Sequence, residues 1–211
     1  MVELNREFLV EKYGKKNLFN LTDIDLGRNG ITKIDSNTFN GLTKLEKLGL
    51  KRNEIEEIDV ILFESLSNLK QLVLFNNKLK RIDSNTFRGL TNLETLSLHH
   101  NEIEEIDVKL FESLSNLIAL YLNNNKLKEI DRKCFEWLIW IEVIVLYENV
   151  GLNSLSFKKA SVFFLYNDVI SNNEVKENLK KYGSISKWHI FLKQFPELGN
   201  NKYLLIIIIY I

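Results

Sequence analysis

Leucine recurs along most of this chain at fixed spacing, and the stretch 69–92 shows the pattern most plainly. Its first positions read LxxLxL, and the leucines at alternate positions, Leu72 and Leu74, are typical of a strand that buries one face. Further apolar residues follow at wider spacing, and the same slots are apolar 24 residues upstream and 24 residues downstream. A fixed period of this length predicts a solenoid in which each repeat forms one turn.

Six repeats in one register begin at Leu21, Leu45, Leu69, Leu93, Leu117 and Ile141. Their shared pattern, LxxLxLxxNxLxxI…F…L, resembles the leucine-rich repeat family in its 24-residue form and covers about two thirds of the chain. The resemblance implies an α/β solenoid that is curved, with a parallel β-sheet on the concave face and short helices or turns on the convex face. It also implies a protein that binds a partner, most often another protein.

The flanking segments predict a cap at each end, because the terminal repeats of a stack lack a neighbour on one side. We expect an N-terminal helical cap over residues 1–20, the solenoid over 21–155, and a C-terminal cap or tail of mixed structure over 156–211. A helix is predicted over Asn5–Tyr13, with Asn5 as its N-cap and Gly14 at its C-terminal end. A separate small module is the alternative for the tail.

The sixth repeat loses the pattern after Asn149, because Gly151 takes the next apolar slot. Beyond it we predict a strand over 161–167 and helices over 171–181 and 186–194. The apolar end, residues 203–211, is too short to span a membrane, which takes about 20 residues. We interpret it as a buried strand or cap segment, with the start of a membrane helix as the alternative.

The unit of duplication is a pair of repeats, since residues 34–46 recur at 82–94 and residues 53–69 recur at 101–117 almost unchanged. Charge follows the same 48-residue period. Acidic side chains of the second and fourth repeats stand in the slots where the third and fifth repeats are basic: Glu54, Glu56, Glu57, Glu102, Glu104 and Glu105 against Lys78, Lys80, Arg81, Lys126 and Lys128. We expect this alternation to oppose slippage of the stack by one repeat.

Asparagine occupies one slot in every repeat: Asn29, Asn53, Asn77, Asn101, Asn125 and Asn149. A buried amide carries two donors and an acceptor, so we predict a structural ladder that bonds backbone groups of its own and the next repeat. Aspartate also recurs, at Asp35, Asp59, Asp83, Asp107 and Asp131, and we interpret each as the cap of a convex segment rather than as a calcium ligand.

No motif of catalysis or cofactor binding is present, so we predict neither an enzyme nor a cofactor. Cys134 is expected to fill space on the convex side. His99 and His100 are neighbours on a predicted strand and point to opposite faces, which makes a poor metal chelate, and no metal site is predicted.

The candidate binding residues lie in slots that face outward from the concave sheet, where the core does not require large side chains. Aromatic and apolar groups gather in the later repeats, and basic groups form a rim in the second. The predicted partner-binding set is Phe75, His99, Tyr121, Tyr147, Val73, Lys51, Arg52 and Lys47. Exposed aromatic side chains on a preformed surface are typical of binding hot spots.

The bulk composition narrows the partner and the compartment. Basic and acidic residues balance at 28 each, so general attraction to nucleic acid or to an anionic membrane is not expected. One cysteine excludes an intramolecular disulfide framework and favours an intracellular, reducing compartment. The leading hypothesis is therefore an intracellular protein–protein interaction module. The alternative is the recognition part of a secreted or membrane-anchored receptor, for which the sequon Asn20-Leu21-Thr22 leaves room.

Overall fold

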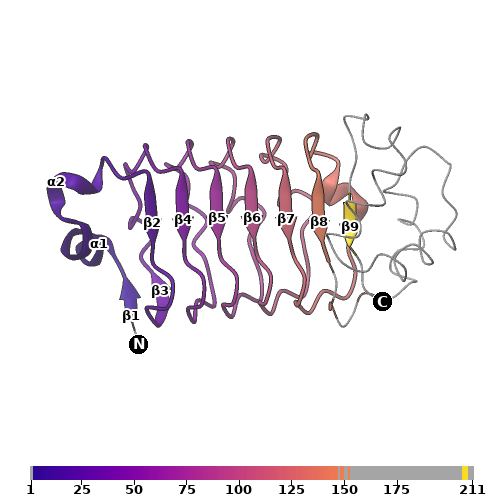
Figure 1. Cartoon of the computed structure of the whole chain (residues 1–211). Coiled ribbons are helices and arrows are strands. Elements are labelled where there is room, and N and C mark those ends of the chain that lie inside the picture. The colour runs from indigo at the N-terminus through magenta and orange to yellow at the C-terminus, as the bar shows by residue number, and fades with distance from the viewer. Residues whose placement is uncertain (1, 147, 150–151, 153–205, 209–211) are drawn as a thin grey trace, which may run out of the picture.

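The computed structural model describes residues 2–146, 148–149, 152 and 206–208, and it shows a parallel-sheet solenoid (Figure 1). Each turn contributes one short strand because the alternating LxxLxL stretch pairs with its copy 24 residues away. The strands are β2 (Asp23–Asp25), β4 (Lys47–Gly49), β5 (Gln71–Val73), β6 (Thr95–Ser97), β7 (Ala119–Tyr121), β8 (Val143–Val145) and β9 (Ile206–Ile208). The pairing is parallel and in register throughout, with Leu48 opposite Leu72 and Leu72 opposite Leu96. The predicted solenoid architecture is confirmed.

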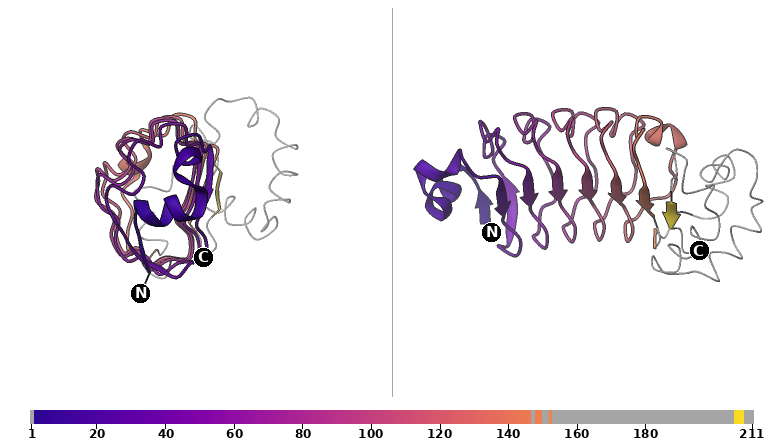
Figure 2. Two further views of the ribbon diagram at one scale, coloured as in Figure 1. Left: turned by 90° about the vertical axis from the view of Figure 1, so that its left-hand side faces the viewer. Right: turned by 45° about the horizontal axis from the view of Figure 1, so that its top comes forward.

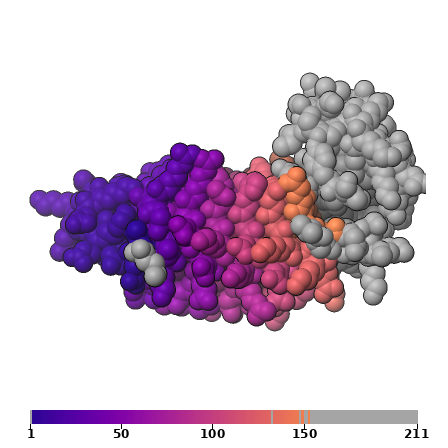
Figure 3. All heavy atoms as spheres, turned by 90° about the horizontal axis from the view of Figure 1, so that it is seen from below, coloured from indigo at the N-terminus to yellow at the C-terminus, as the bar shows by residue number. Residues whose placement is uncertain are grey.

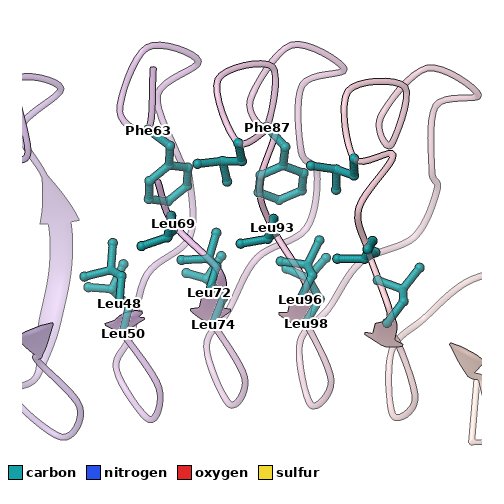
Figure 4. Close-up of a cluster of buried hydrophobic side chains, with 14 of the residues drawn as sticks. Leu48, Leu50, Phe63, Leu69, Leu72, Leu74, Phe87, Leu93, Leu96 and Leu98 are labelled. Atoms are coloured by element: carbon teal, nitrogen blue, oxygen red, sulfur yellow. The ribbon is translucent and has the colours of Figure 1, made fainter. Parts of the chain in front are cut away.

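Leucine and phenylalanine columns fill the inside of the coil. Leu48, Leu72 and Leu96 are fully buried, and each lies over its copy in the next turn (Figure 4). Near the turns opposite the sheet, Phe39, Phe63 and Phe87 stack with ring centroids 6.5 and 6.3 Å apart. One repeat cannot bury these faces alone, so the stack forms one continuous core. In Figure 3 the surface colour changes steadily along the solenoid, because successive turns of the chain lie side by side.

Two helices and a small sheet lie at the N-terminal end. Helix α1 (Arg6–Tyr13) begins where the Asn5 side chain accepts a hydrogen bond from the Phe8 amide at 3.0 Å, and Gly14 ends it with φ 79°. Helix α2 (Lys15–Leu18) follows. The view along the solenoid shows both helices lying across its end (left panel of Figure 2), and Leu9 and Leu18 are buried there.

Strand β1 (Val2–Leu4) pairs in parallel with β3 (Ile31–Ile34) of the first repeat. Neither β1 nor α2 follows from the sequence pattern. Both elements are too short for a periodic signal, and the pairing of β1 is with residues almost 30 positions away.

The side of the coil opposite the sheet is made of turns, which the aspartate column organises. The Oδ1 atoms of Asp35, Asp59 and Asp83 accept from backbone amides two residues further on, at 2.8–3.0 Å. In the fifth repeat the same arrangement at Asp131 begins the 3-10 helix η1 (Arg132–Phe135). In the other described repeats this segment is a turn and no helix forms.

The asparagine column bonds backbone groups of two successive turns. Asn77 donates through Nδ2 to the carbonyl oxygens of Leu74 and Leu50, at 2.9 and 3.0 Å. Its Oδ1 accepts from the Ile55 amide at 3.2 Å. The second turn is therefore the preceding repeat, and the expectation of bonds to the next repeat was wrong. Leu74 and Leu50 each stand directly after a strand, one in the same repeat as Asn77 and one in the preceding repeat, and their carbonyl oxygens accept from its side chain.

The predicted elements at 161–167, 171–181 and 186–194, and the predicted domain boundary at 156, lie outside the described residues. Within 203–211 a strand is present, since β9 pairs in parallel with β8 and sets Ile206 opposite Val143. Among the described helices none is long and apolar enough to cross a membrane.

Candidate protein-binding face

The sheet face is the side of the strands that points away from the core. In β5 and β7 the middle residue, Leu72 or Leu120, is fully buried, while its two neighbours turn outward and are partly exposed. Because the strands are in register, side chains from the same slot of successive repeats form rows across this face. Strand spacing sets neighbouring side chains within a row about 4.8 Å apart, close enough for large side chains to touch.

Three of the predicted binding residues touch one another on this face. The Phe75 and His99 rings stack with centroids 4.5 Å apart and an interplanar angle of 13°. Tyr121 meets His99 edge to face at 6.0 Å. The Arg52 guanidinium lies 5.9 Å from the Phe75 centroid, at cation–π distance. We call Phe75, His99 and Tyr121 the aromatic row. It spans three repeats, and each member is partly exposed.

His99 is uncharged at neutral pH within this row. Burial, with the nearby His100, lowers the pKa of His99 to about 4. Its Nδ1 atom is buried and has no hydrogen-bond partner among the described residues. The centre of the aromatic row is therefore uncharged at pH 7, and it is flanked by the charge of Arg52.

The other predicted binding residues are less tightly grouped. Val73 lies on β5, partly exposed, two residues before Phe75. Lys51 forms an ion pair with Asp25 at 2.9 Å, and this hydrogen bond lowers the pKa of Asp25. Lys47 is exposed on β4. Tyr147 lies outside the described residues.

A groove that the sequence pattern did not reveal runs along one flank of the sheet, before the strands begin. It encloses about 570 Å³ and is lined by Glu46, Asn68, Lys70, Asn92, Glu94, Asn116, Ile118, Trp140 and Glu142. A second asparagine column forms one wall, because Asn68, Asn92 and Asn116 each donate through Nδ2 to a backbone carbonyl of the preceding repeat, at 2.8–2.9 Å. The 24-residue recurrence of these asparagines was the available signal.

The remaining candidate chemistry has structural roles. Burial raises the pKa of the Cys134 thiol to about 11, which disfavours the reactive thiolate. Among the described residues, no group of three or more His, Cys, Asp or Glu side chains is placed to hold a metal ion.

The repeats match a known family over most of the chain. The family model described as BspA type Leucine rich repeat region matches residues 10–142 and 68–185. A search of curated proteins found no match.

Solved structures of similar fold are leucine-rich repeat proteins. The crystal structure of the leucine-rich repeat domain of APL1B has a TM-score of 0.58 and 21% identity, over 70% of this chain and 44% of that one. The crystal structure of the LRIM1/APL1C complex has a TM-score of 0.61 and 23% identity, over 69% of this chain and 26% of that one. The APL1 leucine-rich repeat domain has a TM-score of 0.61 and 23% identity, over 69% of this chain and 36% of that one. At these identities the likeness shows the fold, and this chain spans less than half of each matched chain.

Proposed function

Because the chain belongs to the BspA-type leucine-rich repeat family, whose fold is a common protein-interaction module, we propose that it binds a partner protein on the sheet face. The observation that carries the proposal is the aromatic row formed by Phe75, His99 and Tyr121. Large aromatic side chains supply much of the energy of protein interfaces, and here they are gathered on a preformed surface.

Rigid display explains how this surface would gain affinity. Each aromatic side chain stands on or directly after a strand, and its ring already packs against another ring in the absence of a partner. Binding then costs less side-chain entropy than it would for mobile side chains. Since His99 is neutral at pH 7, its burial under a partner carries no cost of removing a charge from water.

The proposed contact set extends from the aromatic row to its neighbours. Val73 adds apolar surface beside Phe75, and Tyr147 continues the set in the sixth repeat. Arg52, Lys47 and Lys51 form a basic rim that steers an acidic edge of the partner. Lys51 contributes less charge, because Asp25 partly neutralises it.

The proposal also includes an intracellular location, a non-enzymatic role, and a protein rather than a nucleic acid or a membrane as the partner. The single cysteine and the balanced charge support it. The recognition part of a larger secreted or membrane-anchored receptor is the second candidate. The sequon Asn20-Leu21-Thr22 leaves room for it, and one of the similar structures is a complex, LRIM1/APL1C. Modification of Asn20 in a secretory host would support this candidate.

The test is a site-specific crosslink. A photo-crosslinking amino acid replaces Thr95, which lies on β6 beside the aromatic row, and the full chain is exposed to native lysate. We expect a crosslinked partner that disappears when Phe75→Glu and Tyr121→Glu are added. The matched control is the pair Val60→Glu and Val108→Glu. It replaces two exposed apolar side chains, on the turns opposite the sheet, with carboxylates.

The proposal requires the sheet-face pair to abolish the crosslink and the control pair to leave it intact, with melting curves of both variants matching the parent. Capture of the same protein by the parent chain, the sheet-face pair and the control pair would contradict a sheet-face site. Capture only from a crosslinker at Lys109, on the turn side, would move the site to the opposite surface.

A further inference from the structure

We propose that the flank groove is a second docking site, which takes an extended, arginine-bearing segment of a partner protein. It lies apart from the aromatic row and does not depend on the sheet-face proposal. Its lining combines three features: a row of amide groups, an exposed tryptophan beside an isoleucine, and an excess of negative charge.

The charge excess points to a cationic ligand. The groove contains the carboxylates of Glu46, Glu94 and Glu142 and the single ammonium of Lys70, which leaves two negative charges in excess. Lys70 pairs with Glu46 at 3.0 Å, and Glu94 and Glu142 form no ion pair among the described residues. They flank Ile118 on successive turns, since the Ile118 amide donates to the Glu94 carbonyl at 2.8 Å and the Glu142 amide donates to the Ile118 carbonyl at 2.9 Å.

Trp140 and Ile118 favour arginine over a simple ammonium ion. Trp140 is 52% exposed and Ile118 is 37% exposed, and both line the groove. A guanidinium stacks on an aromatic face and donates two parallel hydrogen bonds to a carboxylate, whereas an ammonium is a compact, strongly hydrated charge. Ile118 offers apolar surface for the methylene stem of the arginine.

The asparagine wall and the length of the groove favour a peptide over a small cation. Asn68, Asn92 and Asn116 each donate one Nδ2 hydrogen bond to a backbone carbonyl. The Oδ1 atom and the second Nδ2 hydrogen of each amide can then pair with the N–H and C=O groups of a peptide, which a small cation does not offer. From Glu46 to Glu142 the groove crosses four repeat spacings, roughly 19 Å at the strand spacing. That is the length of about six extended residues.

The experiment measures anisotropy of a fluorescein-labelled hexapeptide of alternating glycine and arginine, titrated with the full chain at low salt. We expect saturable binding that weakens about fivefold in the Glu94→Gln, Glu142→Gln double variant. Trp140→Ala is expected to weaken it about threefold. The same peptide with lysine in place of arginine should bind more weakly, and with glutamate it should not bind.

Matched controls separate the groove from general charge. Glu112→Gln with Glu136→Gln removes the same charge from exposed side chains that do not line the groove, and Trp137→Ala removes a second exposed tryptophan of the same repeat. Both controls should change affinity less than twofold. The proposal is overturned if the wild-type chain shows no saturable binding, if the controls weaken binding as much as the groove variants, or if lysine binds as tightly as arginine.

Discussion

At the scale of single residues, the asparagine column holds adjacent turns together. The Asn77→Ala variant removes three hydrogen bonds at once and leaves the carbonyl oxygens of Leu50 and Leu74 and the Ile55 amide without this partner. The two carbonyls keep a second donor, from Asn53 and Asn101, whereas the buried Ile55 amide is left without a partner. A buried donor without a partner is costly, so we expect the free energy of unfolding to fall by about 1–3 kcal/mol. Urea unfolding followed by circular dichroism measures it.

Asn92→Ala is the matched control, because it also removes an asparagine of the third repeat. Its side chain is exposed and donates a hydrogen bond to the Ser67 carbonyl at 2.9 Å. Water replaces such a bond, so the loss of stability should be well below that of Asn77→Ala. Equal midpoints for the two variants would show that the buried column does not stabilise the stack.

His99 gives a prediction for pH at the same scale. Its pKa is lowered to about 4 in the folded chain, against 6.5 for the ordinary imidazole, so between these values the unfolded state binds a proton that the folded state does not. Stability is therefore expected to fall as the pH drops from 6.5 toward 4. Since the ring is half exposed, the effect is smaller than full burial would give.

Thermal unfolding between pH 7 and pH 5 isolates this effect, because the paired carboxylates Asp25, Glu54, Glu102 and Glu104 have lowered pKa values and are still ionised there. The His99→Gln variant should lose less stability than the wild type over this interval. The same slope in both proteins would mean that His99 is not the titrating group.

At the scale of elements, one backbone position after β2 and after each of β4 to β8 adopts a left-handed conformation. Arg28, Arg52, Asn76, His100, Asn124 and Glu148 all have φ between 53° and 61°. Glycine and asparagine tolerate this region, whereas a β-carbon makes it costly for other residues. The repeats therefore carry strain wherever an arginine, histidine or glutamate stands in this slot.

Arg28 allows a test with an inverted control. Glycine normally destabilises relative to alanine, yet at φ 61° we expect Arg28→Gly to be more stable than Arg28→Ala by about 1 kcal/mol. At Lys33, an exposed residue of β3, alanine should be better than glycine by about 0.5–1 kcal/mol. The same order at both sites, measured by urea unfolding, would contradict the role of backbone conformation.

The elements also show how far sequence reasoning reaches. The strands and the leucine core follow from alternation and a fixed period, because the same buried positions are apolar in every repeat. Strand β1 was missed because three residues carry no periodic signal and its partner, β3, is distant in sequence. The sequence placed Phe75, His99 and Tyr121 on one face, but their ring contacts and the lowered pKa of His99 depend on side-chain packing that no pattern encodes.

At the scale of the whole molecule, ion pairs between turns follow the alternation of acidic and basic repeats. Lys78 pairs with Glu54 at 2.9 Å and Lys126 pairs with Glu102 at 2.6 Å, each across one turn. Arg88 joins Glu64 at 2.7 Å in the same way on another side of the coil. Each pair is exposed and contributes little alone. Together they distinguish two wrong alignments of the repeats. A shift by one repeat sets like charges beside each other, and a shift by two repeats restores opposite charges.

Two deletions test this difference through the direction in which added salt changes the melting temperature. Removal of residues 69–92 keeps the leucine columns in register but sets Glu54 beside Glu102, and Glu46 beside Glu94. Removal of residues 69–116 also keeps the columns and sets Glu54 beside Lys126 and Glu56 beside Lys128, which offset the like pairs Glu57 with Glu129 and Glu64 with Glu136. Salt screens both kinds of contact, and the Debye length falls to roughly 3 Å at 1 M.

We therefore expect added salt to raise the melting temperature of the single-repeat deletion by relieving repulsion, and to lower or leave unchanged that of the two-repeat deletion and of the parent chain. The leucine columns carry no charge, so only the charged pairs between turns differ in sign between the two deletions. Slopes of the same sign in the two deletions would show that the alternating charges do not distinguish one register of the stack from another.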